Sequence, residues 1–388
     1  MAGLAFSFPY NGNSRVLDAQ LALNGRNGNT VREVYLNVPQ EIAGSGRAGN
    51  TDRMTTEEFV RVAERIHAAG VRVDMTMNAT CGGSEWYGDE QVNKLVGFIR
   101  CMHEEHGVEA VTLANPFHIE CVRRACPDIE ISASVLSEID CMGRAQAFAD
   151  AGATTFTPAT SINRDLKLLG SIARRTGMEV KLMVNEGCLY KCPFRTFHMN
   201  LISHRSQEAR PEGKAFSFAC GERIETDPAE IFRSNWVRPE ELETYVRTGA
   251  ACFFKIVGRD MLASKVMRAC NAYVDEGYDG NLLDLMCSSI GFYTVETSAY
   301  VDNKTLGSSG YFKRLSTCNR KCYDCTYCTE LAEKYLRYGW VTEENLYDMG
   351  QGPMAEMIKA RFGGRYPKCP DMTARPRKAG EGMPSRVA

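Results

Sequence analysis

The chain contains no apolar run that approaches the ~20 residues a membrane-spanning helix requires. It also has no excess of basic residues: its net charge is −2, and this balance does not indicate a broad nucleic-acid-binding surface. The first residues, MAGLAFSFPYNGNS, lack the basic start and long apolar segment of a secretory signal peptide. We therefore expect a cytoplasmic protein without a membrane span.

Two common enzyme signatures are missing as well. The segment PYNGNS, which follows the first strand pattern, is a poor match to the glycine-rich phosphate fingerprint of dinucleotide-binding folds. No order of serine, histidine and aspartate indicates a serine peptidase. With 388 residues, 44% of them hydrophobic, the chain suffices for one large domain with an extension or for two ordinary domains.

The chain does contain a regular alternation of strand and helix patterns. Eight short apolar segments begin at Leu4, Val31, Val71, Val108, Ile129, Thr154, Glu179 and Cys252, and amphipathic segments separate most of them. This alternation predicts parallel strands joined by right-handed crossovers. Eight such units by about residue 275 predict an α/β fold, a closed (β/α)8 TIM-type barrel, whose usual size is ~250 residues. A doubly wound open sheet is the alternative.

Local signals support the helices of this pattern. Thr55 to Glu58 reads as a capping box at the start of a helix. Pro239 and Gly249 would begin and end a later helix. We expect the barrel over residues 1–275, a cysteine-rich extension over 276–365, and a flexible tail rich in Pro, Gly and Arg over 366–388.

Polar residues follow most of the strand patterns, and a barrel gathers such residues at the C-terminal ends of its strands. The seventh strand leads into VNEGCLYKCPFRTFHMNLISH, which combines an acid, cations, histidines and two cysteines. We expect catalytic roles for Glu186, Arg195, His198 and Arg259, and substrate contacts from Asn78, Asn115, Asn185 and Lys255. The alternatives are turn-forming asparagines, a structural histidine and arginines ion-paired in the core.

Sixteen cysteines in a reducing compartment are more typical of metal ligands than of disulfides. Cys318, Cys322, Cys325 and Cys328 form a C-x3-C-x2-C-x2-C run that mirrors the bacterial ferredoxin spacing. This spacing favours a 4Fe–4S cluster, although tetrahedral zinc is also compatible with it. Several other cysteines lie in helical patterns and should be small core residues, namely Cys101, Cys121, Cys126, Cys141 and Cys270.

A second set of cysteines surrounds the seventh-strand loop. Cys188 and Cys192 lie in it, and Cys220 follows downstream. For a fourth ligand we prefer Cys81, which follows the third strand, and Cys287 is the other possibility. Cys252 begins the eighth strand and so falls at the opposite end of the barrel. The alternative is a group of reactive or buried thiols without metal.

Several segments resemble the collagenase-like peptidase family, peptidase family U32, which includes proteins of oxygen-independent ubiquinone and RNA hydroxylation. PYNGN resembles the early A-P-A-G-N turn of that family, EVYLNV its V-Y-L-G strand, and EISASVLSEIDC the strand that carries its S-T-Q motif. VNEGC and FFKIVGR resemble the more specific H-G-x-x-C and L-K-I-E-G-R motifs. Order and spacing agree over most of the first 260 residues.

The chain also departs from the family pattern. TPATSINRD replaces the segment after the sixth strand that contains Ala-Arg-Glu, and Val257 stands where the family has a glutamate. The run from Cys318 to Cys328 lies outside the shared region. These differences indicate a distinct subfamily.

The resemblance implies a barrel that binds a 4Fe–4S cluster through cysteines after the seventh strand, best matched here by Cys188, Cys192 and Cys220. It further implies oxygen-independent hydroxylation or a related redox step on a small molecule or modified residue. The oxygen donor would be a carboxylate such as prephenate, which Arg195 and Arg259 could bind. The expected partners are an electron donor and a subunit of the same family. The alternatives are a scaffold subunit of a hydroxylase complex and a zinc-dependent peptidase.

Overall fold

The computed structural model describes residues 3–39, 42–46, 54–205, 220–221, 223–224, 226–259, 261–287 and 297–340. The predicted tail at 366–388 and the strand-end residue Asp260 lie outside these ranges. The side chain of His204 is likewise not described.

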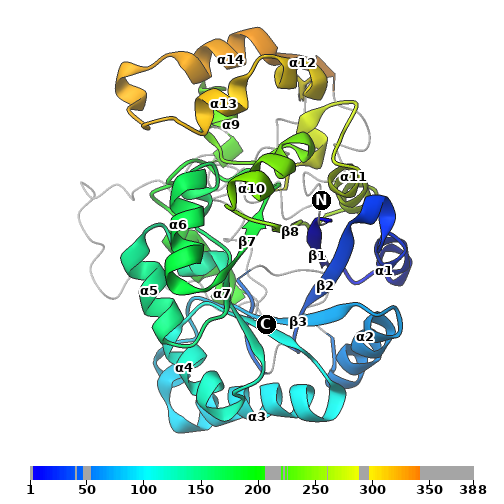
Figure 1. The fold of residues 1–388 in the computed structure, drawn as a ribbon. Coiled ribbons are helices and arrows are strands. Elements are labelled where there is room, and N and C mark those ends of the chain that lie inside the picture. The colour runs from blue at the N-terminus through cyan, green and yellow to red at the C-terminus, as the bar shows by residue number, and fades with distance from the viewer. Residues whose placement is uncertain are drawn as a thin grey trace, which may run out of the picture.

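Eight parallel strands close into a barrel in sequence order, which confirms the predicted (β/α)8 fold (Figure 1). Strand β8 pairs with both β1 and β7, so the sheet has no free edge. All eight predicted apolar segments form strands, whose bounds are Ala5–Pro9 (β1), Thr30–Asn37 (β2), Arg72–Met77 (β3), Ala110–Leu113 (β4), Glu130–Ala133 (β5), Thr155–Phe156 (β6), Glu179–Met183 (β7) and Phe253–Lys255 (β8).

Helices surround the barrel between successive strands (Figure 1). Their bounds are Ser14–Leu21 (α1), Thr56–Ala68 (α2), Asp89–His106 (α3), Pro116–Ala125 (α4), Met142–Asp150 (α5), Leu166–Thr176 (α6), Arg195–Arg205 (α7), Glu230–Arg233 (α9), Leu242–Thr248 (α10) and Ala263–Val274 (α11). The predicted capping box is present at α2, where Thr55 and Glu58 satisfy each other's backbone N–H groups. Gly249 ends α10 in the left-handed conformation, as expected of a helix-terminating glycine.

Charged residues occupy part of the barrel interior. Lys181 on β7 donates to Glu33 Oε1 at 2.7 Å and to Asp74 Oδ2 at 3.1 Å, and all three side chains are fully buried. Thr112 Oγ1 donates to Asp74, and Ser7 Oγ donates to Glu33. Burial lowers the pKa of Lys181, but the two carboxylates raise it above its ordinary value, so the lysine stays charged. This network closes the barrel beneath its C-terminal end.

The segment after the barrel forms a small unit of its own. Strands Thr297–Val301 (β9) and Leu336–Trp340 (β10) pair antiparallel, although the sequence from residue 276 onward shows no clear period. Between them lie helices Asn303–Ser308 (α12), Tyr311–Leu315 (α13) and Tyr327–Tyr335 (α14). Figure 1 shows these helices beside α9 and α10, and α14 packs on α9.

The expected core cysteines fall into different environments. Cys126 and Cys270 are buried, which confirms their assignment, while Cys101 and Cys121 are half-buried. The prediction is wrong for Cys141, which is exposed because it precedes α5 as its N-cap residue and does not face the core. Among the described residues, no helix has the length and hydrophobicity that a bilayer crossing needs.

Candidate functional site

A pocket with about 620 Å³ of empty space opens at the C-terminal end of the barrel. Its lining comes from seven strands or the loops that follow them, and from α7. Five of the predicted site residues line it: Asn78, Glu186, Arg195, Lys255 and Arg259. The other lining residues are Tyr35, Gly46, Thr76, Thr112, Ser134, Val135, Leu136, Thr157, Met183, Met199, Val257 and Gly258.

Arg195 brings a partly uncommitted guanidinium to this pocket. Its Nε donates to Glu138 Oε1 at 2.5 Å, while its buried Nη1 has no hydrogen-bond partner among the described residues. Burial lowers the pKa of Arg195, but Cys188, Glu138 and Glu186 together raise it above the ordinary value. The residue is therefore a permanent cation with one N–H group available for a carboxylate oxygen.

Arg259 and Asn78 are held in place by polar neighbours. Arg259 donates to Asn37 Oδ1 and to Ser45 Oγ, and its guanidinium lies over the Tyr35 ring. Asn78 Nδ2 donates to Ser134 Oγ at 2.9 Å, and its Oδ1 accepts from the Gly46 N–H at 3.0 Å. These contacts fix the orientation of both side chains at the pocket wall.

Lys255, the last residue of β8, differs from the other lysine of the barrel interior. Its Nζ lies 3.7 Å from the centre of the Tyr35 ring, and no described carboxylate or carbonyl accepts a hydrogen bond from it. Burial, the largest influence, lowers the pKa of Lys255 to about 7, and Lys181 and Arg259 contribute in the same direction. At neutral pH a large fraction of this side chain is therefore an uncharged amine.

Three predicted site residues lie outside the pocket lining. Asn115 caps α4 through the Phe117 N–H and donates to the Tyr87 hydroxyl. Asn185 is fully buried and hydrogen-bonds three backbone groups, on Val257 and Leu285. His198 is half-buried on α7. Asn115 and Asn185 thus connect backbone segments, and a role for any of these three in substrate binding or catalysis stays a prediction.

The cysteines of the seventh-strand loop gather beside Arg195. The pKa of Cys192 is lowered to about 6. The main cause is a hydrogen bond with Cys220, which outweighs the opposite effect of burial. Cys188 influences Arg195 electrostatically, so the two side chains lie near each other. Thiolates are the metal-binding form of cysteine, so Cys188, Cys192 and Cys220 are the candidate metal ligands near Arg195.

Both candidates for a fourth ligand lie at this end of the barrel. Cys287 exchanges backbone hydrogen bonds with Asn185 and Gly187, which places it beside the loop that contains Cys188. Cys81 follows Thr80, whose backbone N–H donates to Ser203 Oγ on α7 at 2.9 Å. Cys252 is exposed at the opposite end, where its Sγ lies 3.9 Å from Glu179 Oε1.

The second cysteine set surrounds a separate pocket with about 350 Å³ of empty space. Cys318, Cys322, Cys325 and Cys328 all line it, together with Arg233, Arg314, Leu315, Asn319, Lys321 and Tyr327. Four thiol groups and three cations suit an anionic metal–thiolate centre. Burial raises the pKa of Cys328 to about 11, and a bound metal would deprotonate such a thiol.

The two cysteine sets are direct neighbours. Tyr190 lies between Cys188 and Cys192, and the Arg320 guanidinium packs 4.7 Å from the centre of its ring. Arg320 also donates to Asn235 Oδ1 at 2.7 Å, and the adjacent Ser234 Oγ donates to the Cys188 carbonyl at 2.7 Å. One short segment after α9 therefore touches both the barrel loop and the cysteine run of the extension.

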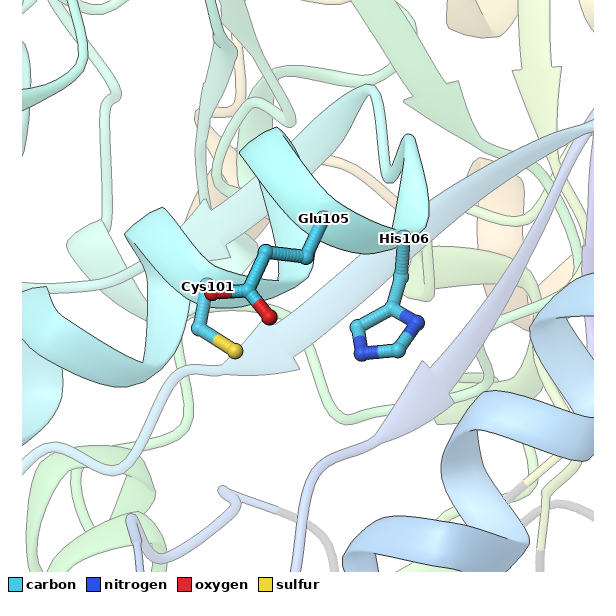
Figure 2. A group of neighbouring side chains, drawn as sticks. All are labelled: Cys101, Glu105 and His106. Carbon is cyan, nitrogen blue, oxygen red and sulfur yellow. The ribbon is translucent and has the colours of Figure 1, made fainter.

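A further group of ligand-type side chains lies on α3, outside the lining of the barrel-mouth pocket. Figure 2 shows the three side chains on this helix. One donor atom from each of Cys101, Glu105 and His106 lies within 4.8 Å of the other two. Burial and the neighbouring Glu105 raise the pKa of Cys101, which disfavours the thiolate. This helix supplies three donors and no fourth, and we assign it no function.

Several polar residues that line the pocket from within the strands were not among the predicted site residues. Tyr35, Thr76 and Thr112 alternate along their strands with residues that face the surrounding helices. The signal was the two-residue period of a strand, since a polar residue inside an apolar strand of a closed barrel points to the interior. Tyr190 and Arg320 carried no comparable signal.

Comparisons with known proteins identify the family of this chain. The model of peptidase family U32 matches residues 26–276, and the chain belongs to this family. An uncharacterized protease of Methanocaldococcus jannaschii is 30% identical over 311 residues, which cover 79% of this chain and 89% of that protein. A solved structure of a U32 peptidase is 18% identical and has a TM-score of 0.47, covering 66% of this chain and 94% of its own.

Proposed function

We propose that this chain is an iron–sulfur oxidoreductase of family U32 that acts on a carboxylate in the barrel-mouth pocket. The observation that carries the proposal is the placement of Cys188, Cys192 and Cys220 beside Arg195, a cation that lines this pocket. We further propose 4Fe–4S clusters at these cysteines and at Cys318–Cys328, although zinc also suits the second set. When bound, such clusters supply single electrons.

The protein's own residues would bind and orient the substrate. The buried Arg195 Nη1 has no hydrogen-bond partner in the part of the chain that the structure describes, so it is available to bind one carboxylate oxygen. Glu186 lies at the same wall and could hold a proton. The activity class that we favour is an oxygen-independent hydroxylation or a related redox step, supported by the family resemblance and by the cysteines near Arg195.

Metal analysis after anaerobic purification tests the proposal. Two 4Fe–4S clusters would give about eight irons and about eight sulfides per chain. The double substitution Cys318→Ala and Cys322→Ala should remove about half of the iron. Cys252→Ala, at the opposite end of the barrel, should leave the iron content unchanged.

A second measurement identifies the fourth barrel ligand. Cys81→Ser and Cys287→Ser would be compared by electron paramagnetic resonance after mild oxidation. Loss of one ligand should convert the barrel cluster to a three-iron form with its own spectrum, and it should do so in one of these two variants.

The family name and the archaeal relative favour peptidase activity as a second candidate. Stoichiometric zinc without sulfide, together with peptide hydrolysis that stops in Glu186→Gln, would establish this reading and refute the redox proposal. Iron and sulfide in a protein that binds no carboxylate would instead indicate a scaffold subunit. Calorimetry with a panel of mono- and dicarboxylates, repeated with Arg195→Gln, distinguishes the scaffold from the enzyme.

A further inference from the structure

Lys255 and Arg195 bring two complementary groups to one pocket. The Lys255 side chain is 8% exposed, and its amine faces the pocket from the end of β8. Arg195 reaches the same pocket from α7, and its buried Nη1 donates to no described residue. Arg195 is paired with Glu138 through Nε only, so its Nη1 can still bind a carboxylate. An amine beside this group matches a ligand that offers a carbonyl and a carboxylate.

The rest of the barrel interior explains why Lys255 differs from Lys181. Glu33 and Asp74 are the acids nearest to both lysines, and both accept from Lys181 at 3.1 Å or less. Lys255 instead packs against the Tyr35 ring, with the cation of Arg259 nearby. Asp74 and Glu33 favour the charged ammonium, but burial and the two cations oppose it. Desolvated lysines in such surroundings are good nucleophiles.

We propose that Lys255 Nζ forms an imine with the carbonyl carbon of a 2-oxo carboxylate whose carboxylate is bound by Arg195. The nitrogen bonds to the carbonyl carbon, and the carbonyl oxygen leaves as water together with the two amine hydrogens. The step requires no oxidant or reductant. It rests on the proposed function in that it specifies the substrate class of the same pocket.

Reductive trapping tests this step directly. The full-length protein, purified anaerobically, is incubated with pyruvate and sodium borohydride, and its mass is then measured intact and after peptide mapping. We expect one reduced pyruvyl group per chain, located at Lys255. Lys255→Arg should abolish the adduct, whereas Lys94→Arg, which changes an exposed lysine on α3, should retain it.

The role of Arg195 has a separate readout. Arg195→Gln should raise the pyruvate concentration needed for half-maximal trapping at least tenfold, because the carboxylate loses its cation. Trapping with acetone, which has a carbonyl and no carboxylate, should be unaffected by the same substitution.

Several results would overturn the inference. These are the absence of any adduct with pyruvate and larger 2-oxo acids, an adduct spread over surface lysines, and an adduct that persists in Lys255→Arg. If Lys255→Arg does not fold, the peptide map of the unsubstituted protein decides. Iron and sulfide are measured on the same sample to distinguish the imine proposal from the proposed iron–sulfur function. A protein with full cluster content and no adduct refutes only the imine.

Discussion

At the scale of single residues, the charge of Lys181 holds two acids inside the barrel. Glu33 and Asp74 are fully buried and have this lysine in common. Burial raises the pKa of Glu33 above its ordinary value. Burial acts in the same direction on Asp74, but Lys181 outweighs it there, and the pKa of Asp74 is lowered. Lys181 is the cation that hydrogen-bonds both acids, and its loss leaves buried carboxylates without their ion-pair partner.

We therefore expect Lys181→Met to lower the free energy of unfolding by about 3–5 kcal/mol. Denaturation in urea, followed by far-ultraviolet circular dichroism, measures the change. Lys94→Met, at an exposed position, should shift the curve by less than about 0.5 kcal/mol. A loss in Lys181→Met no larger than that of the control would mean that the interior network contributes little to stability.

The rate of borohydride trapping at Lys255 should depend on pH. The uncharged amine is the nucleophile, so the rate should rise with pH through a midpoint near 7, which is the lowered pKa of this lysine. An ordinary lysine would show its midpoint about three units higher. Lys181→Met should move the midpoint upward, because Lys181 is a like charge that lowers the pKa of Lys255. A midpoint that stays constant in this variant would contradict the assigned electrostatics.

At the scale of secondary-structure elements, the loop between β7 and α7 and the cysteine run before α14 form one contact. Arg320 packs on Tyr190 and donates a hydrogen bond to Asn235. A hydrogen bond from a charged group is worth about 1.5–3 kcal/mol. The stacking of the guanidinium on the ring adds about 0.5–1 kcal/mol. This contact is one of several between the extension and the barrel, beside the hydrogen bonds of Tyr311 to Glu241 and of Arg238 to Asn303.

Arg320→Ala should therefore weaken the docking of the extension by about 1.5–3 kcal/mol. Hydrogen exchange should become faster in residues 311–336 and remain unchanged in the barrel strands. Lys313→Ala, at an exposed position on α13, is the control and should not alter exchange. Equal exchange in both variants would show that other contacts dominate.

At the scale of the whole molecule, the two units differ in what stabilises them. One cluster of buried apolar side chains extends from the barrel into the extension, whose own secondary structure is only a two-stranded sheet and helices of six, five and nine residues. Such a small unit ordinarily needs an additional cross-link such as a metal. The proposed centre at Cys318–Cys328 would supply it.

Removal of iron should consequently affect the extension first. After oxidation and chelation, we expect limited proteolysis to cleave within 297–340 while the barrel remains intact. The double variant Cys318→Ala and Cys322→Ala should show the same pattern without oxidation. Simultaneous loss of both units would mean that they unfold cooperatively.

Much of this architecture follows from local patterns. Each barrel strand coincides with an apolar segment, and the helix boundaries at Thr55 and Gly249 obey capping rules. The site was predicted less completely: Glu186, Arg195, Lys255, Arg259 and Asn78 meet at the pocket because strand ends converge in a barrel. The pairing of β9 with β10 joins residues more than 30 positions apart, and the contact of Tyr190 with Arg320 joins residues more than 100 positions apart. No local sequence pattern encodes contacts over such separations.

The contact between Tyr190 and Arg320 also bears on exposure to air. The loop that it covers contains Cys188 and Cys192, which are half-buried in the intact chain. A chain shortened after α11 would present this loop to solvent and to dissolved oxygen. We therefore expect a chain shortened in this way to lose its barrel thiols to air oxidation faster than the longer chain does.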